Sequence, residues 1–196
     1  MKLHLGCGKL YLKNYINVDI ESKIADIKHD IVKLDFINNE KVNEIYICHV
    51  LEHIKRQDTI NLFLEWNRLL QKNGVLRISV PNFESIVKIY QKNKNISELI
   101  GLINGGQRNK YDIHYICYDL KIMKEILETC GFTDINIYDP FHFLNEDEDD
   151  YSKAYLPHLD FENGTCMSLN IECKKERNVN KTNIKLTDNL KKFFKI

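Results

Sequence analysis

Short apolar stretches alternate along the chain with longer segments in which apolar residues recur every three or four positions. The short stretches are typical of buried strands, and the periodic segments are typical of helices that pack by one face. Six stretches are predicted as strands: 2–6 (KLHLG), 16–20 (INVDI), 44–50 (EIYICHV), 75–81 (VLRISVP), 134–139 (DINIYD) and 168–175 (SLNIECKK).

The clearest helix is predicted from Asp58 to Lys72. Asp58 can cap its first turn, and Asn73-Gly74 can supply a left-handed stop. Four apolar residues of this segment fall near one face: Ile60, Phe63, Leu64 and Leu70.

A second helix is expected after Asp119, with its end at Gly131. Its apolar face would carry Leu120, Met123, Leu127 and Cys130. The alternation of strands and helices predicts an α/β fold with a doubly wound, Rossmann-like, mostly parallel sheet.

Nearly forty residues, about 82–118, separate the fourth predicted strand from the second helix. We expect one or two helices there, followed by the segment NGGQRNKYDIHYICY. A connection of this length inside one domain is uncommon and often functional.

A glycine turn, Gly6-Cys7-Gly8, directly follows the first predicted strand. Glycines at such a place let the backbone approach a ligand closely, because they carry no Cβ. Asp19 ends the second strand, and its carboxylate can accept hydrogen bonds from both hydroxyls of a ribose. Segment 9–15 is too short for a crossover helix and is predicted as a loop or a single turn, which leaves this side of the pocket open.

The same spacing argues against a nicotinamide or flavin site. A dinucleotide fingerprint needs a third glycine where Tyr11 stands, and an acidic residue about 20 residues further on. Asp19 follows Gly8 after only 11 positions. The turn and the carboxylate together therefore favour a bound nucleoside.

Composition describes an ordinary globular protein of 196 residues, with 43% hydrophobic and 29% charged residues. The formal net charge is zero, so we expect no dedicated nucleic-acid binding. No apolar run approaches the length of a membrane span, no signal peptide precedes the first strand, and the six cysteines lack zinc-site spacing. We therefore expect a cytoplasmic, reduced protein.

Charge is concentrated in two places. Residues 146–150 are all acidic, and residues 174–196 carry eight Lys or Arg against two Asp or Glu. Both are expected to be solvated. The end of the chain, TDNLKKFFKI, is interpreted as either a frayed terminus or a short basic amphipathic helix.

Five segments, in this order and spacing, resemble class I S-adenosylmethionine-dependent methyltransferases. They are LHLGCGKLYLKNYINVDI, HDIVKLDF, IYICHVLEHI, LLQKNGVLRISVPN and LKIMKEILETCGF. The chain is most similar to the small "methyltransferase type 11" group associated with surface polysaccharides. The resemblance covers about residues 2–139, implies a final antiparallel strand at 168–175, and lacks the helix that usually precedes the first strand. We expect one domain at 1–175 and a basic tail at 176–196.

The resemblance implies S-adenosylmethionine as the cofactor and assigns residues to its parts. Asp19 would hold the ribose, and His49 would lie near the reactive sulfonium. Asp30 and Ile31 would lie against the adenine. The methionine part would be lined by Gly6, Cys7 and Gly8.

The segment HVLEH places His49, Glu52 and His53 at the end of the IYICHV strand, and their spacing puts them on one side of a helical turn. Methyl transfer to a hydroxyl requires removal of a proton, for which a histidine is suited near neutral pH. His53 is the first candidate for this base, with Glu52 orienting it, and His114 is the second.

Two other interpretations of this cluster stay open. Glu52 can cap the following helix while His53 makes only structural hydrogen bonds. Alternatively, the three histidines and Glu52 bind a divalent metal, for which their donor atoms suit a transition metal better than magnesium. We assign no metal to the predicted site.

The acceptor is expected to be a small molecule or a sugar- or nucleotide-linked compound. Aromatic and basic residues of the 82–118 insert suit such a ligand: Arg108, Lys110, Tyr111, Tyr115 and Tyr118. The expected function is O-methylation in surface-glycan biosynthesis. The alternatives are methylation of a small phosphorylated or carboxylic metabolite, and a cofactor-binding scaffold without turnover.

Overall fold

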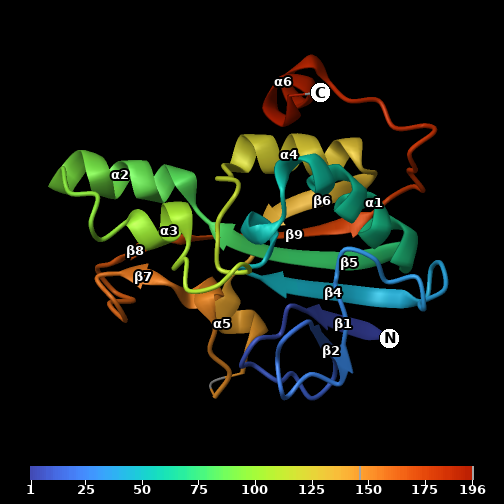
Figure 1. Ribbon diagram of the computed structural model, residues 1–196, viewed down its shortest axis with the longest axis horizontal. Coiled ribbons are helices and arrows are strands. Elements are labelled where there is room, and N and C mark those ends of the chain that lie inside the picture. Colours follow the sequence, from blue (N-terminus) through green and yellow to red (C-terminus); the bar gives the residue numbers. More distant parts are fainter. Residues whose placement is uncertain (146, 196) are drawn as a thin grey trace.

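A seven-stranded sheet forms the centre of the computed structural model, which describes residues 1–145 and 147–195 (Figure 1). Its strands lie in the order β3-β2-β1-β4-β5-β9-β6. Neighbours from β3 to β5 pair in parallel, whereas β9 pairs antiparallel with both β5 and β6. The strands are β1 (Lys2–Leu5), β2 (Ile16–Asp19), β3 (Ile27–Lys28), β4 (Val42–Cys48), β5 (Leu70–Pro81), β6 (Phe132–Ile137) and β9 (Ser168–Lys175).

All six predicted strands are present, and the α/β fold with its final antiparallel strand is confirmed. The two-residue β3 was not predicted. The hairpin of β7 (Tyr155–Leu156) with β8 (Thr165–Cys166) and the 3-10 turn η3 (Tyr151–Lys153) lie outside the main sheet and were also not predicted.

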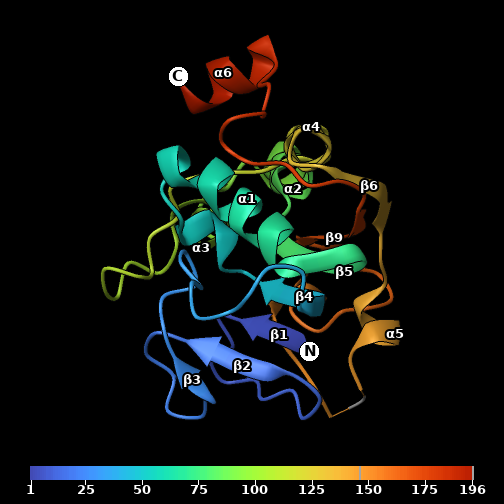
Figure 2. The ribbon, with the colours of Figure 1, turned by 90° about the vertical axis from the view of Figure 1, so that its right-hand side faces the viewer.

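Helices cover the two faces of the sheet unequally. Figure 2 shows the helix α1 (Thr59–Leu69) on one side of the sheet and the short α5 (Pro140–Phe143) on the other. The face of α1 is also covered by α4 (Leu120–Thr129). Segment 9–15 is a loop, as predicted, so that no helix connects β1 to β2.

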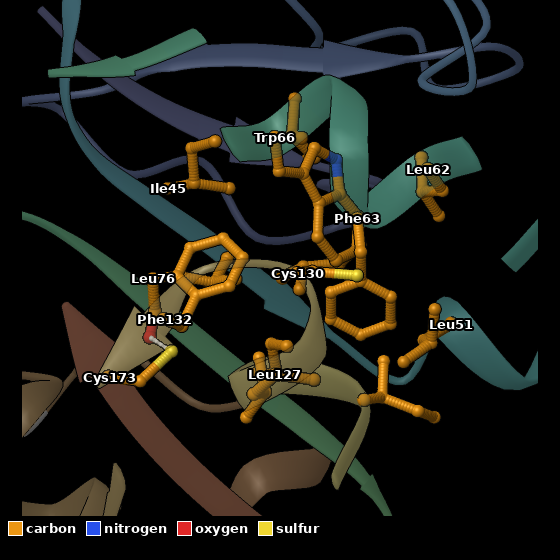
Figure 3. Close-up of a cluster of buried hydrophobic side chains, with 14 of the residues drawn as sticks. Ile45, Leu51, Leu62, Phe63, Trp66, Leu76, Leu127, Cys130, Phe132 and Cys173 are labelled. Carbon is orange, nitrogen blue, oxygen red and sulfur yellow. Dashed lines mark hydrogen bonds between the residues drawn. The ribbon is translucent and has the colours of Figure 1, made fainter. Parts of the chain in front are cut away.

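The main core lies between the sheet and the α1–α4 layer (Figure 3). Trp66 and Phe63 of α1 meet edge-to-face, with ring centroids 5.1 Å apart, and both are fully buried. The Cys173 thiol of β9 lies 3.7 Å from the Leu76 carbonyl of β5. Each large side chain buried here contributes about 1.5–3 kcal/mol to stability.

The predicted helix at 58–72 is shorter than expected. It ends at Leu69, and β5 begins at Leu70, which pairs with Val42 of β4. Asn73 has the expected left-handed backbone (φ +62°), but inside β5 rather than at a helix end. Asp58 stands at the N-cap position without a capping hydrogen bond from its side chain. Strand pairing therefore outweighs the helical tendency of residues 70–72.

The second helix is confirmed as α4. The Asp119 carboxylate accepts a hydrogen bond from the Ile122 amide (2.7 Å), and Gly131 follows with φ +88°. The long connection holds two helices, α2 (Phe83–Asn93) and α3 (Ile100–Asn104), as predicted.

The basic tail ends in the helix α6 (Asp188–Phe194), which packs beyond α4 (Figure 1). Leu190 and Phe194 are buried in the main core, and the Thr187 hydroxyl at the helix start is hydrogen-bonded to Glu125 of α4. The amphipathic-helix prediction is confirmed, and the frayed terminus is wrong for residues up to 194. Glu146 of the acidic stretch and Ile196 of the tail lie outside the described residues.

Within residues 1–145 and 147–195, no helix combines the length and apolar character needed to cross a lipid bilayer. All six cysteines are free thiols.

We predict that Ile45→Ala destabilises the protein by about 2–5 kcal/mol, because Ile45 is fully buried in the main core and its loss leaves a cavity. Urea denaturation measures this change. The matched control is Ile96→Ala at a side chain that is 51% exposed, for which the change stays within about 0.5 kcal/mol. Equal losses for the two variants would contradict the assigned core.

Candidate functional site

The glycine turn leaves β1 with two residues in the left-handed region. Gly6 has φ +69° and Gly8 has φ +53°. A Cβ on Gly6 would lie 2.3 Å from Cγ2 of Val50, so the residue must be glycine for the turn to approach the chain after β4. A Cβ on Gly8 would meet no described atom within 4 Å. The backbone beside Gly8 is therefore open to a ligand.

Asp19 holds the glycine turn in place. Its Oδ2 accepts a hydrogen bond from the Gly8 amide (3.0 Å), and its Oδ1 accepts from the amides of Glu21 and Ser22 (both 2.8 Å). The Ser22 hydroxyl in turn donates to the Gly8 carbonyl (2.5 Å). A carboxylate offers about four acceptor positions, so these three bonds leave Oδ2 able to accept another.

The other residues predicted to contact the cofactor differ in their exposure to solvent. The His29 amide donates to the Asp19 carbonyl (3.2 Å), which brings the segment after β3 to the end of β2. Asp30 is exposed there, whereas Ile31 is buried in the main core. Cys7 is also buried, and burial raises the pKa of its thiol.

The HVLEH segment does not form the predicted helical turn. His49 has a left-handed backbone (φ +50°), and the 3-10 turn η1 begins two residues later, at Leu51–His53. His49 still reaches Glu52, with Nδ1 3.3 Å from Oε1, and its Nε2 lies 2.9 Å from the Ser168 hydroxyl. The strand end, rather than helical spacing, brings these residues together.

Glu52 is a fully buried carboxylate. Neither of its oxygens has a hydrogen-bond partner among the residues described. Burial acts to raise the pKa of Glu52, but His49 and His53 outweigh it, so the pKa lies below its ordinary value. No backbone amide of the described residues donates to the Glu52 side chain, so the capping role expected for Glu52 is wrong.

The rings of His53 and His114 meet edge-to-face beside Glu52, with their centroids 4.7 Å apart. His53 Nδ1 lies 3.2 Å from the Ile113 carbonyl, and His114 Nδ1 lies 2.9 Å from the Leu102 carbonyl. His114 Nε2 lies 3.9 Å from Glu52 Oε1. The structure thus brings together the three residues predicted as catalytic, although they are up to 62 positions apart in the sequence.

Both imidazoles have a fixed tautomer, because a ring nitrogen that faces a carbonyl must carry the proton. In the neutral form of each ring, Nδ1 donates and Nε2 carries the lone pair. Burial lowers the pKa of His114, which favours its neutral form. The cluster therefore presents two nitrogen lone pairs and one carboxylate.

The long insert reaches the cluster through its last part. The Tyr115 amide donates to the Glu52 carbonyl (2.8 Å), and Tyr115 and Tyr111 are exposed. Tyr118, in contrast, is buried in the main core. Arg108 forms an ion pair with Asp112 (2.6 Å), so its charge is already matched.

Two neighbours of His49 were not predicted from the sequence. Ser168 begins β9, and Tyr151 of η3 lies with its ring 5.4 Å from that of His49. Because β9 runs antiparallel to β5, its first residue, Ser168, lies at the edge of the sheet where the parallel strands end. The family resemblance predicts this antiparallel strand, so it could have located Ser168. Nothing in the sequence pattern placed Tyr151.

A cavity of about 520 Å³ lies beside α5 and η3. It is lined by residues of the connection between β6 and β8: Phe141, Leu144, Asn145, Asp149, Lys153, Leu159 and Phe161. Its walls are partly aromatic, with the Phe141 and Phe161 rings 5.0 Å apart.

Several solved structures have the same fold. A SAM-dependent methyltransferase from Archaeoglobus fulgidus is 16% identical, with a TM-score of 0.55 over 89% of this chain and 85% of that one. A methyltransferase from Methanosarcina mazei is 12% identical, with a TM-score of 0.55 over 89% and 92%. One from Thermotoga maritima is 14% identical, with a TM-score of 0.52 over 89% and 82%. No family model and no curated protein matches the chain. These likenesses show that the chain has the fold of SAM-dependent methyltransferases.

We predict that Gly6→Ala destabilises the protein more than Gly8→Ala. Both substitutions impose a left-handed backbone on alanine, at about 1–2 kcal/mol. Only Gly6→Ala also overlaps Val50, which adds about 1–3 kcal/mol. Urea denaturation measures both losses.

A double-mutant cycle tests the cause. Val50→Ala in the Gly6→Ala background should remove the overlap and show coupling of about 0.5–3 kcal/mol, whereas Val50→Ala with Gly8→Ala should be additive. Absence of coupling between positions 6 and 50 would contradict the close approach.

Proposed function

We propose that the chain is an S-adenosylmethionine-dependent methyltransferase that methylates a hydroxyl of a small or sugar-linked acceptor. One observation carries this proposal. The open glycine turn, tied to Asp19, lies at the carboxyl ends of β1 and β2 in a sheet with the methyltransferase fold. Ligands of open α/β sheets bind at this edge.

The chain's residues fit such a cofactor at two points. The space beside Gly8 admits a ligand against the backbone, and Asp19 Oδ2 can accept a further hydrogen bond from a ribose hydroxyl. In the proposal, Gly6, Cys7 and Gly8 line the methionine part, Asp30 and Ile31 border the adenine, and His49 lies near the sulfur. When bound, the cofactor supplies a methyl group already activated on a sulfonium. The residues therefore mainly align donor and acceptor.

A hydroxyl acceptor must also lose its proton. If the cluster holds no cation, His53 Nε2 is the atom that accepts it, because Nδ1 already donates to the Ile113 carbonyl. His114 has the same arrangement through the Leu102 carbonyl and is the second candidate. The Glu52 carboxylate then stabilises the imidazolium that forms.

Two exposed aromatic residues that contact the cluster support a sugar-like acceptor. Tyr115 donates its amide to the Glu52 carbonyl, Tyr151 lies beside His49, and both can offer ring faces and hydroxyls. The six free thiols support a reducing, cytoplasmic setting. Assignment to surface-glycan biosynthesis rests on the sequence resemblance alone.

We predict that the purified chain binds S-adenosylhomocysteine and not NAD in calorimetric titrations. Asp19→Ala should weaken this binding by about 10–100-fold, because charge-assisted hydrogen bonds contribute about 1.5–3 kcal/mol. Glu21→Ala is the matched control, because this exposed carboxylate lies two positions from Asp19. The Glu21→Ala protein should bind S-adenosylhomocysteine with unchanged affinity. His53→Ala should also leave the affinity unchanged, since His53 is assigned to the acceptor.

Folding of each variant is checked by its urea midpoint, because Asp19 also holds the glycine turn. A folded wild-type chain that does not bind S-adenosylhomocysteine would contradict the proposal and leave only a shared fold. Equal loss in Asp19→Ala and Glu21→Ala would contradict the assigned site.

A further inference from the structure

We propose that Glu52, His53 and His114 bind a divalent transition-metal ion, with Zn²⁺ as the ion of matching chemistry. Binding of the ion follows from these three side chains alone. Its role in activating an acceptor rests on the proposed methyltransferase function.

The first argument is the burial of the Glu52 carboxylate without a hydrogen bond from the described residues. The carboxylate is completely buried, and both oxygens lack a hydrogen-bond donor in the described part of the chain. The two ion-pair contacts, from His49 at 3.3 Å and His114 at 3.9 Å, both reach Oε1, so no cationic side chain of residues 1–145 and 147–195 contacts Oε2. Buried charges are normally paired or coordinate metals, because removing them from water is costly.

The second argument is the orientation of the two imidazoles. Histidines that bind metals usually donate the other ring N–H to a carbonyl or carboxylate, which fixes the ring and raises its basicity. His53 and His114 both do this, through the carbonyls of Ile113 and Leu102. Nε2 of each ring is therefore available, and His114 Nε2 is directed at Glu52.

The third argument is distance. One donor atom from each of the three residues lies within 4.8 Å of the others. Around a tetrahedral zinc with bonds of about 2.0–2.2 Å, donor atoms are about 3.3–3.6 Å apart. Side-chain rotations that shorten the longest separation by about 1.5 Å would complete the site.

The donor set indicates the ion and its use. Two imidazole nitrogens and one carboxylate oxygen suit zinc and other transition metals better than magnesium or calcium, which prefer oxygen ligands. Three protein ligands with a fourth position open are typical of catalytic zinc sites, whereas structural sites use four.

The open position gives the ion a role in the proposed reaction. A hydroxyl bound there would have a lowered pKa: its oxygen would keep the electron pair of the O–H bond, and its proton would pass to water. His53 cannot be a ligand and the base at once, since both use the lone pair on Nε2. A metal-bound cluster would therefore replace His53 as the group that activates the acceptor.

Calorimetric titration of the full chain with ZnCl₂, after treatment with a chelator, tests the proposal. We expect one zinc per chain. The affinity for zinc should fall by more than about 100-fold in Glu52→Gln and in His114→Ala. Even loss of an outer-shell partner costs about 10–100-fold, and these residues are direct ligands. His158→Ala is the matched control, because this histidine is exposed and far along the sequence, and its zinc affinity should equal that of the wild type.

A second readout excludes loss of folding as the cause. Co²⁺ added to the wild type should give visible absorption bands of a low-symmetry site, and these should be absent in the two ligand variants at an unchanged urea midpoint. Absence of zinc binding, or binding that survives both Glu52→Gln and His114→Ala, would overturn the proposal.

Titration with S-adenosylhomocysteine separates the two proposals. If the chain binds S-adenosylhomocysteine but not zinc, the metal site is overturned, and His53 stays the candidate base. If zinc binds through these residues without S-adenosylhomocysteine, the metal site is supported, and the methyltransferase function fails.

Discussion

The parallel pairing of β1 with β4 is the constraint on which the rest of the site depends. It places the ends of the two strands side by side, so that the turn at Gly6 packs against Val50, the residue directly after His49. Only a residue without Cβ fits that contact. The glycine turn proposed for the cofactor and the histidine cluster proposed for the acceptor are thereby held at adjoining strand ends, which a methyl transfer between them requires.

The second feature is a charge that the fold buries without a hydrogen bond. Glu52 lies at the start of the connection after β4, and the long insert closes over it through Tyr115 and His114. A buried carboxylate that accepts no hydrogen bond from the described residues lowers stability, whereas an apolar residue in its place would not. Its position among three imidazoles is typical of a functional site, where groups are arranged for chemistry at the expense of stability.

Much of the fold could be predicted from the sequence. Strands buried on both faces are recognisable as short apolar runs, and helix α4 has clear sequence markers at both of its ends. The Asp119 cap and Gly131 mark α4 at both ends, and the shortness of segment 9–15 excludes a helix there. The end of α1 could not be predicted, because Leu70 continues the helical period but pairs with Val42, 28 positions earlier in the chain. Long-range pairing decides such boundaries, and periodicity does not report it.

The candidate site, like the fold, has parts that the sequence predicts and parts that it does not. The glycine turn, Asp19 and the HVLEH residues have local signatures, and His114 was selected because it lies in a long connection. The contact of His49 with Ser168 depends on β9, which returns between β5 and β6. The tautomers of His53 and His114 depend on carbonyls of the insert, which no sequence pattern locates.

A crystal structure of the chain with S-adenosylhomocysteine would test the central claim most directly. The account predicts the ligand along Gly6–Gly8, with its ribose hydroxyls at Asp19 and its sulfur on the side of His49. A ligand bound elsewhere, or bound at this edge with its sulfur directed away from His49 and the Glu52 cluster, would contradict it.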